Sequence, residues 1–143
     1  FRRVLFRSEK YSIIDDCYNA NPASMKSSLS VLSRSDTRTV AILGDMFELG
    51  PEEKELHYET GRYAAEQNID VLVCIGALSS ETARGAKENA SGGMSVYHFP
   101  SKDAFFRKMD QILQTGDTIL VKASHGMEFP EIVERLRKEE TQS

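Results

Sequence analysis

Two acids and two amides stand close together near the start of the chain, in the stretch Ile13-Ile14-Asp15-Asp16-Cys17-Tyr18-Asn19-Ala20-Asn21-Pro22. Two apolar residues precede the acids, as in a strand that runs into a polar loop. Successive strand residues point to opposite faces, so one Asp can cap the turn while the other faces the rim of a sheet. A rim carboxylate can accept both hydroxyls of a ribose or hold a metal ion through water. Turn and capping roles explain Asp and Asn equally well, and the spacing leaves both interpretations open.

The segment after these acids leads into a predicted helix. Pro22 favours an extended backbone at Asn21, and Ser24 is predicted to be the helix N-cap. Asn19 and Asn21 would then offer neutral donors and acceptors beside a helix N-terminus, a place that favours an anion. An ordinary strand-to-helix loop is the alternative.

Two further polar segments follow apolar runs, Leu43-Gly44-Asp45-Met46-Phe47-Glu48-Leu49-Gly50 and Lys122-Ala123-Ser124-His125-Gly126-Met127. The first lacks the Gly-Lys-Ser/Thr ending of a phosphate-binding P-loop. In the second, Lys122 could neutralise a phosphate or carboxylate. Ser124 and His125 suggest a nucleophile and a base, but adjacent side chains seldom face each other, so a polar recognition loop is the better interpretation.

Strand and helix patterns alternate along the chain. The predicted strands are short and rich in Val and Ile, at Tyr11–Asp15, Thr39–Leu43, Val71–Ile75, Ser95–Phe99 and Thr118–Lys122. Helical patterns are predicted at Ser24–Ser33, Pro51–Asn68, Ser79–Glu88, Ser101–Leu113 and Glu131–Glu139. The alternation predicts an α/β, Rossmann-like domain with a mostly parallel sheet of five to six strands and helices on both faces. In such a sheet the carboxyl ends of the strands form the site, which gathers the polar segments on one rim.

His57, within the second helix, is interpreted as a structural or solvated surface histidine.

The composition argues against several classes of function. The chain has 143 residues, enough for one domain, and a net charge of −4 gives no basic footprint for nucleic acid. No apolar run approaches the ~20 residues of a membrane span. Cys17 and Cys74 lie in no metal-binding pattern. We therefore expect a cytoplasmic protein with reduced thiols, no metal site, no nucleic-acid partner and no membrane insertion.

The first eight residues differ from the rest. Phe1-Arg2-Arg3-Val4-Leu5-Phe6-Arg7-Ser8 holds three of the 18 Lys and Arg residues and lacks the apolar region of a signal peptide. Written as TTC AGA CGT GTG CTC TTC CGA TCT, it resembles a translated short-read sequencing adapter. The sequence therefore predicts a non-native leader over 1–8 and a native domain over 9–143.

The three polar segments together resemble one family. Asp15 to Met25, Leu43 to Gly50 with Leu56-His57 after it, and Leu120 to Met127 resemble the ordered motifs of the Mur ligase C-terminal domain. They are most similar to the members that add D-alanyl-D-alanine to UDP-N-acetylmuramoyl-tripeptide. The resemblance runs from about Tyr11 to Leu136.

This resemblance implies ATP-driven amide formation in bacterial peptidoglycan synthesis, with ATP and Mg held mainly by a central domain N-terminal to this chain. The domain itself would close over the nucleotide and help to bind the acceptor, D-alanyl-D-alanine. The UDP-MurNAc-tripeptide would be bound through other domains, the ligase would act as a monomer, and this chain alone would be inactive, with no catalytic residue of its own. The implied nucleotide-binding residues are Asp16, Tyr18, Asn19 and Asn21. The implied substrate-binding residues are Asp45, Lys122, Ser124, His125 and Gly126.

Two departures and two alternatives accompany the resemblance. Ala123 stands where the family usually has Gly, and His125 stands where it usually has Arg. If that Arg meets a carboxylate or phosphate, His125 could do so fully only when protonated. The first alternative is a response-regulator receiver, since Asp15, Asp16, Asp45 and Lys122 imitate its acids and lysine. Against it, Asp45 follows the second predicted strand instead of the third. The second alternative is a non-catalytic binding module of flavodoxin-like shape.

Overall fold

The protein is an α/β sandwich with one mixed sheet between two layers of helices, in a computed structural model that describes residues 3–7 and 9–141. Five strands are parallel and the first is antiparallel to its neighbour. In chain order the strands are β1 (Val4–Arg7), β2 (Ser12–Asp15), β3 (Thr39–Gly44), β4 (Val71–Ile75), β5 (Ser95–Phe99) and β6 (Thr118–Lys122). The helices are α1 (Pro22–Ser33), α2 (Glu53–Ala65), α3 (Ser79–Asn89), α4 (Lys102–Phe106), α5 (Met109–Ile112) and α6 (Pro130–Thr141), with short 3-10 turns η1 (Gly50–Glu52) and η2 (His125–Met127).

The strand order across the sheet is β1-β2-β6-β3-β4-β5. The last strand of the chain therefore lies between β2 and β3, in the middle of the sheet. Flavodoxin-like and receiver domains place their parallel strands in the order 2-1-3-4-5. The five parallel strands here, counted along the chain, follow the order 1-5-2-3-4. The flavodoxin-like and receiver alternatives are therefore wrong, and the predicted mostly parallel sheet with two helical layers is confirmed.

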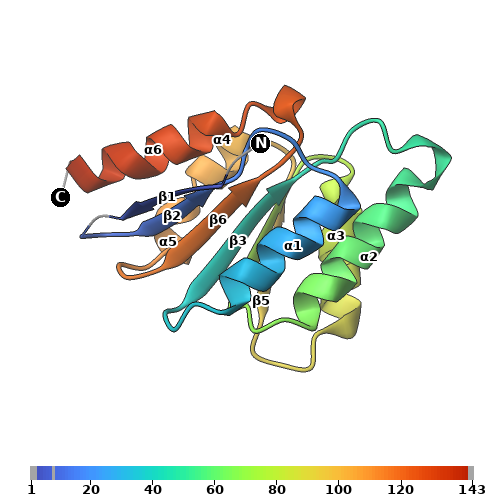
Figure 1. The fold of residues 1–143 in the computed structure, drawn as a ribbon, viewed down its shortest axis with the longest axis horizontal. Helices are drawn as coiled ribbons and strands as arrows, with labels where there is room; N and C mark the ends of the chain where they lie inside the picture. The colour runs from blue at the N-terminus through green and yellow to red at the C-terminus, as the bar shows by residue number, and fades with distance from the viewer. Residues whose placement is uncertain (1–2, 8, 142–143) are drawn as a thin grey trace.

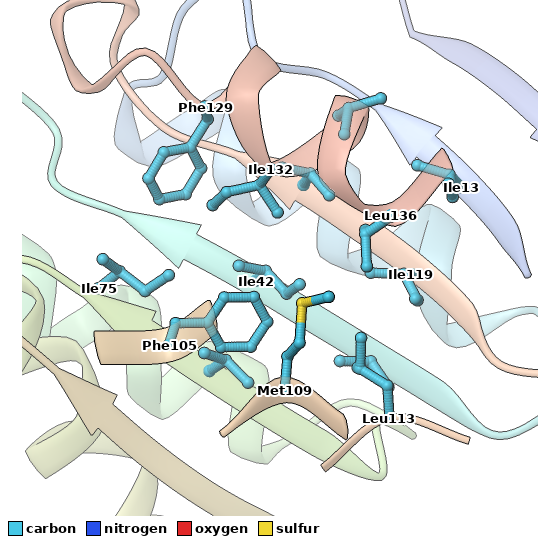
Figure 2. Close-up of a cluster of buried hydrophobic side chains, with 14 of the residues drawn as sticks. Ile13, Ile42, Ile75, Phe105, Met109, Leu113, Ile119, Phe129, Ile132 and Leu136 are labelled. Carbon is cyan, nitrogen blue, oxygen red and sulfur yellow. The ribbon is translucent and has the colours of Figure 1, made fainter. Parts of the chain in front are cut away.

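Alternate residues of the buried strands enter two separate cores, as the period of two requires. On one face, Ile13, Ile42 and Ile119 pack with side chains of α4, α5 and α6. Figure 2 shows this core, with Phe105 and Met109 on one side of Ile42 and with Ile132 and Leu136 of α6 on the other. On the opposite face, Ile14, Leu43 and Leu120 belong to the core formed with α1, α2 and α3. Figure 1 shows the two helical layers on either side of the sheet.

Beyond shifts at element ends, such as α2, which is Glu53–Ala65 where Pro51–Asn68 was predicted, the predicted elements differ from the structure in three places. The N-cap of α1 is Asn21, whose Oδ1 accepts a hydrogen bond from the Ser24 backbone N–H, so Ser24 is the third helical residue and the predicted cap was wrong. Pro22 accounts for the earlier start, because its fixed φ suits the first turn of a helix. The predicted helix over Ser101–Leu113 is split into α4 and α5, since Lys108 donates to the carbonyl of Phe105, three residues back, and the α-helical ladder breaks there. Finally, β1 lies within the stretch interpreted as a leader.

Candidate functional site

The carboxyl ends of β2, β6 and β3 lie side by side. Asp15 is level with Val121 in the sheet, and Leu43 is level with Lys122. The segments that follow these strands therefore meet on one rim, which Figure 1 places at the end of the molecule toward which β6 and β3 point. The polar residues gathered by the sequence prediction come from these segments, so the structure brings them together.

Asp16 and Lys122 form a buried ion pair beneath this rim. Both side chains are almost fully buried, and Lys122 Nζ lies 3.0 Å from Asp16 Oδ2. The same carboxylate oxygen accepts a hydrogen bond of 2.5 Å from Ser28 Oγ in α1, and Arg3 Nε lies 3.3 Å away. Lys122 Nζ also donates to the backbone carbonyl of Asn19 at 2.9 Å. The charges therefore neutralise each other and tie β6 to the loop after β2.

Asp45 is the second buried carboxylate of the rim. Its Oδ1 accepts hydrogen bonds from the backbone N–H of Ser79 at 2.8 Å and from Ser79 Oγ at 2.7 Å. Asp45 thus satisfies a donor at the N-terminus of α3 that would otherwise attract an anion. Gly76 makes room for this contact, since a Cβ there would lie 2.5 Å from Asp45 Oδ1, and its φ of +117° suits glycine.

Ser124 joins the turn after β6 to the loop after β3. Its backbone N–H donates to the carbonyl of Asp45 at 3.0 Å, and its Oγ accepts from the backbone N–H of Phe47 at 2.8 Å. The hydroxyl oxygen is thus occupied as the acceptor of a backbone hydrogen bond. A serine nucleophile activated by His125 is not what this geometry provides.

The exposed groups on the rim are of a different kind. Tyr18 is 68% exposed, and its ring centroid lies 6.4 Å from that of His125. Phe47 is 42% exposed and lies against Gly126, where a Cβ would come within 3.2 Å of the ring. Asn19 is also exposed, as is Asn21, although the side chain of Asn21 is used as the cap of α1. The rim thus offers two aromatic rings, an imidazole and amide groups above a buried, internally paired layer of charge.

His57 was interpreted from sequence as a structural or solvated histidine on the helix surface; its contacts agree with a structural histidine, but the surface placement is wrong. The side chain is fully buried. Its Nε2 accepts a hydrogen bond from the backbone N–H of Met46 at 2.9 Å, and its Nδ1 lies 2.7 Å from the carbonyl oxygen of Glu53. Phe47 lies inside the polar segment Leu43 to Gly50 and Ser28 inside the first predicted helix, but neither was given a role. The sequence held no further signal, because an exposed Phe in a loop and a Ser in a helix are common.

The thiol of Cys17 lies next to these residues but is not poised for nucleophilic chemistry. Cys17 is buried and donates to the carbonyl of Val121 at 3.4 Å. Burial, with the neighbouring Asp15 carboxylate, raises the pKa of the thiol well above its ordinary range. A thiol held neutral in this way is a weak nucleophile.

Residues 3–7 and 9–141 present neither a cluster of metal ligands nor a membrane-spanning helix. These residues contain no cluster of three or more His, Cys, Asp or Glu side chains that could hold a metal ion. None of the helices in this part of the chain is long and apolar enough to cross a membrane.

Comparison with known proteins identifies relatives of this chain and of its fold. The family model described as "Mur ligase, glutamate ligase domain" matches residues 2–125. The UDP-N-acetylmuramoyl-tripeptide–D-alanyl-D-alanine ligase of Bacillus subtilis is 35% identical over 127 residues, which cover 87% of this chain and 28% of that protein. A crystal structure of MurF from Acinetobacter baumannii matches 96% of this chain and 30% of its own, with a TM-score of 0.80 at 24% identity. MurF from Thermotoga maritima in complex with ADP matches the same shares with a TM-score of 0.77 at 23% identity, so these structures show the fold. The chain spans less than a third of the length of each of these relatives.

Proposed function

The chain belongs to the Mur ligase family, and on this premise we propose that it is the C-terminal domain of an ATP-dependent ligase that joins D-alanyl-D-alanine to UDP-N-acetylmuramoyl-tripeptide. The observation that carries the proposal is the 35% identity to the Bacillus subtilis ligase of that name across 87% of this chain. The MurF structure with ADP supports a nucleotide as one ligand of the whole enzyme. The reaction would take place in the bacterial cytoplasm, where ATP is available.

The proposed reaction has two steps. The carboxylate of the tripeptide attacks the γ-phosphorus of ATP, which forms an acyl phosphate and releases ADP. The free amine of D-alanyl-D-alanine then attacks the acyl carbon, loses a proton, and the tetrahedral intermediate expels inorganic phosphate as the amide forms. Positioning of the two reactants and stabilisation of the developing charge account for most of the acceleration in such a reaction.

The rim of this chain suits the positioning part of that chemistry. Asn21 engages one backbone donor at the N-terminus of α1, Asp45 engages one at the N-terminus of α3, and Asp16 engages the ammonium of Lys122. The exposed aromatic rings and amides suit uncharged parts of ligands, such as a base, a ribose or a peptide. We assign Tyr18 and Asn19 to the nucleotide side and His125 with the Gly126 backbone to the acceptor side. Asp16, Asn21, Asp45, Lys122 and Ser124 support these groups from below. Mg and the triphosphate would be bound by the rest of the enzyme.

The activity is tested in the intact ligase that carries this domain. We expect phosphate release that requires ATP, UDP-MurNAc-tripeptide and D-alanyl-D-alanine together, with a product whose mass equals the joined substrates minus water. The 143-residue polypeptide alone should form no product. Release that is independent of D-alanyl-D-alanine, with a different amino acid as acceptor, would assign the chain to another ligase of the family.

Two substitutions test the assignment of the nucleotide side and the acceptor side of the rim separately. Tyr18→Ala should raise KM for ATP roughly 10-fold, because stacking of a base on an aromatic ring contributes about 1–3 kcal/mol, with KM for the dipeptide little changed. His125→Ala should raise KM for D-alanyl-D-alanine and leave KM for ATP little changed. Tyr97→Ala, at an exposed tyrosine on β5, is the matched control and should change neither. Exchanged effects of Tyr18→Ala and His125→Ala would reverse the assignment.

A further inference from the structure

His57 connects α2 to the loop that carries Asp45 and Phe47. The imidazole is fully buried, and each ring nitrogen has a backbone partner. We propose that His57 is a positioning residue that sets the acceptor side of the site by holding the backbone of Met46. The catalytic consequence of this inference rests on the proposed ligase function, whereas the geometry of the contact does not.

The two backbone partners determine the state of the ring. The Met46 N–H can only donate, so Nε2 must present a lone pair to it. The Glu53 carbonyl oxygen can only accept, so Nδ1 must carry the hydrogen. His57 is therefore the neutral Nδ1–H tautomer, and it joins the first turn of α2 to the loop after β3.

The three residues Asp45, Met46 and Phe47 are each tied to a different element. Asp45 contacts Ser79 of α3, Met46 contacts His57 of α2, and Phe47 donates to Ser124 after β6. The contact to Met46 is made by His57, which we assign to neither the nucleotide side nor the acceptor side of the rim. Loss of His57 would leave the buried N–H of Met46 without an acceptor, which is costly enough to displace the loop.

A displaced Met46 would act on the acceptor side through its neighbour. Phe47 lies against Gly126, and its N–H is bound by Ser124 Oγ. The turn that contains Ser124, His125 and Gly126 therefore rests on the segment that His57 holds. Tyr18 and Asn19 come from the loop after β2, which Lys122 fixes through Asn19 instead. The effect of His57 should accordingly be larger for D-alanyl-D-alanine than for ATP.

The contact is measured first in the 143-residue chain. The ring ¹⁵N resonances of His57 should show an unprotonated Nε2 and a protonated Nδ1. His57→Leu keeps an apolar body and removes both hydrogen bonds, so amide hydrogen exchange at Met46 and Phe47 should accelerate roughly 10-fold or more beyond any global change. His57→Gln, whose amide can accept and donate at its end, should be closer to wild type.

Thr60→Val is the matched control, because Thr60 is also buried on α2 but its Oγ1 donates within the helix to Leu56. It should change global stability without selective exchange at Met46 and Phe47. A ring protonated on Nε2 in the wild-type chain would overturn the inference, as would equal exchange in the Leu and Gln variants. The ring measurement needs no substitution, so it decides even if His57→Leu fails to fold.

The consequence is measured in the intact ligase. His57→Leu should raise KM for D-alanyl-D-alanine roughly 10-fold, with KM for ATP changed less than about 2-fold, and His57→Gln should restore most of the difference. Equal changes in both KM values, or a fall in kcat alone, would overturn the positioning role. A wild-type enzyme that lacks the ligase activity would instead refute the proposed function, and the exchange and ring measurements would still stand.

Discussion

At the scale of single residues, the side chains near the rim that look most reactive are paired within the protein. Asp16 and Lys122 form an ion pair that is buried away from water, and the Asp45 carboxylate accepts a hydrogen bond from the backbone N–H of Ser79. Burying a charge is costly unless it is paired and hydrogen-bonded, and the three donors on Asp16 Oδ2 meet that demand. The side chains exposed near them, which we propose as the ligand contacts, are those of Tyr18, Asn19 and His125.

The buried ion pair makes a first prediction. Lys122→Met should destabilise the chain by about 3–5 kcal/mol, because it leaves the Asp16 carboxylate buried without its main cation. The double variant Asp16→Asn with Lys122→Met should lose much less, since no uncompensated charge remains. Urea unfolding followed by circular dichroism measures both. A single-variant loss below about 1 kcal/mol would show that the carboxylate reaches water or another cation.

The two thiols make a second prediction, on pH. Burial raises the pKa of Cys17 and of Cys74 well above the ordinary range, whereas both would ionise near about 8.5 in the unfolded chain. Above that pH the unfolded chain has released protons that the folded chain keeps. The contribution to stability is therefore complete below about pH 8 and is lost as the pH rises, by up to about 1.4 kcal/mol per pH unit for each thiol.

Urea unfolding between about pH 7 and about pH 10 measures this loss. Other groups also titrate in that range, so the comparison is with the double variant Cys17→Ala and Cys74→Ala, which should lose less stability over the same interval. Identical slopes for the two chains would mean that the thiols ionise equally well in the folded protein.

At the scale of elements, α2 and α3 touch through glycine. A Cβ on Gly61 would lie 1.8 Å from the carbonyl oxygen of Thr82, and a Cβ on Gly85 would lie 2.1 Å from the carbonyl oxygen of Tyr58. These neighbours are backbone atoms and cannot move aside without moving a helix. The two helices are therefore held closer together than any larger side chain would permit.

This contact reverses the usual effect of alanine in a helix. Ala is favoured over Gly by about 1 kcal/mol in an unconstrained helix, but Gly61→Ala and Gly85→Ala should each destabilise by about 1–3 kcal/mol or more through overpacking. Gly126→Ala is a useful comparison, because its neighbour is the exposed ring of Phe47, which can rotate. Thermal unfolding of the three variants checks the order. Stabilisation by Gly61→Ala would show that the helices separate easily.

The elements also show what the sequence could and could not predict. β4, β5 and β6 match their predicted bounds, since short runs of β-branched, aliphatic or aromatic residues between turn residues leave little alternative. The break between α4 and α5 was missed because Phe105, Met109 and Ile112 keep one apolar face across it. His57 was misplaced because burial of a single polar residue in a helix depends on what packs above it, and here that is the backbone of Met46.

At the scale of the whole molecule, the strand order decides which residues meet. The motifs predicted that Asp16, Asp45 and Ser124 share a rim, because all three follow parallel strands. They could not predict that Lys122 pairs with Asp16, since this contact exists only because β6 lies between β2 and β3. The family resemblance inferred from the motifs is confirmed by the match over residues 2–125, while the individual ligand roles stay predictions.

The first strand gives the last prediction. β1 pairs with β2 along one edge only, and Val4 and Leu5 are 41% and 48% exposed. Phe6 packs partly against the core, and Arg3 reaches Asp16, but Lys122 holds that carboxylate independently. A chain that lacks residues 1–8 should therefore keep the five parallel strands and lose roughly 1–3 kcal/mol, about the contribution of one partly buried aromatic side chain.

Circular dichroism and urea unfolding of the shortened chain measure this difference. An edge strand accepts many short apolar sequences, since its backbone supplies the pairing, so the presence of β1 is compatible both with a native strand and with the predicted adapter-derived leader. The nucleotide sequence read continuously across the codon of Glu9 distinguishes them. A shortened chain that cannot fold would mean that β1 is needed to cover Ser12–Asp15, and any native upstream segment would then have to supply a strand at the same edge.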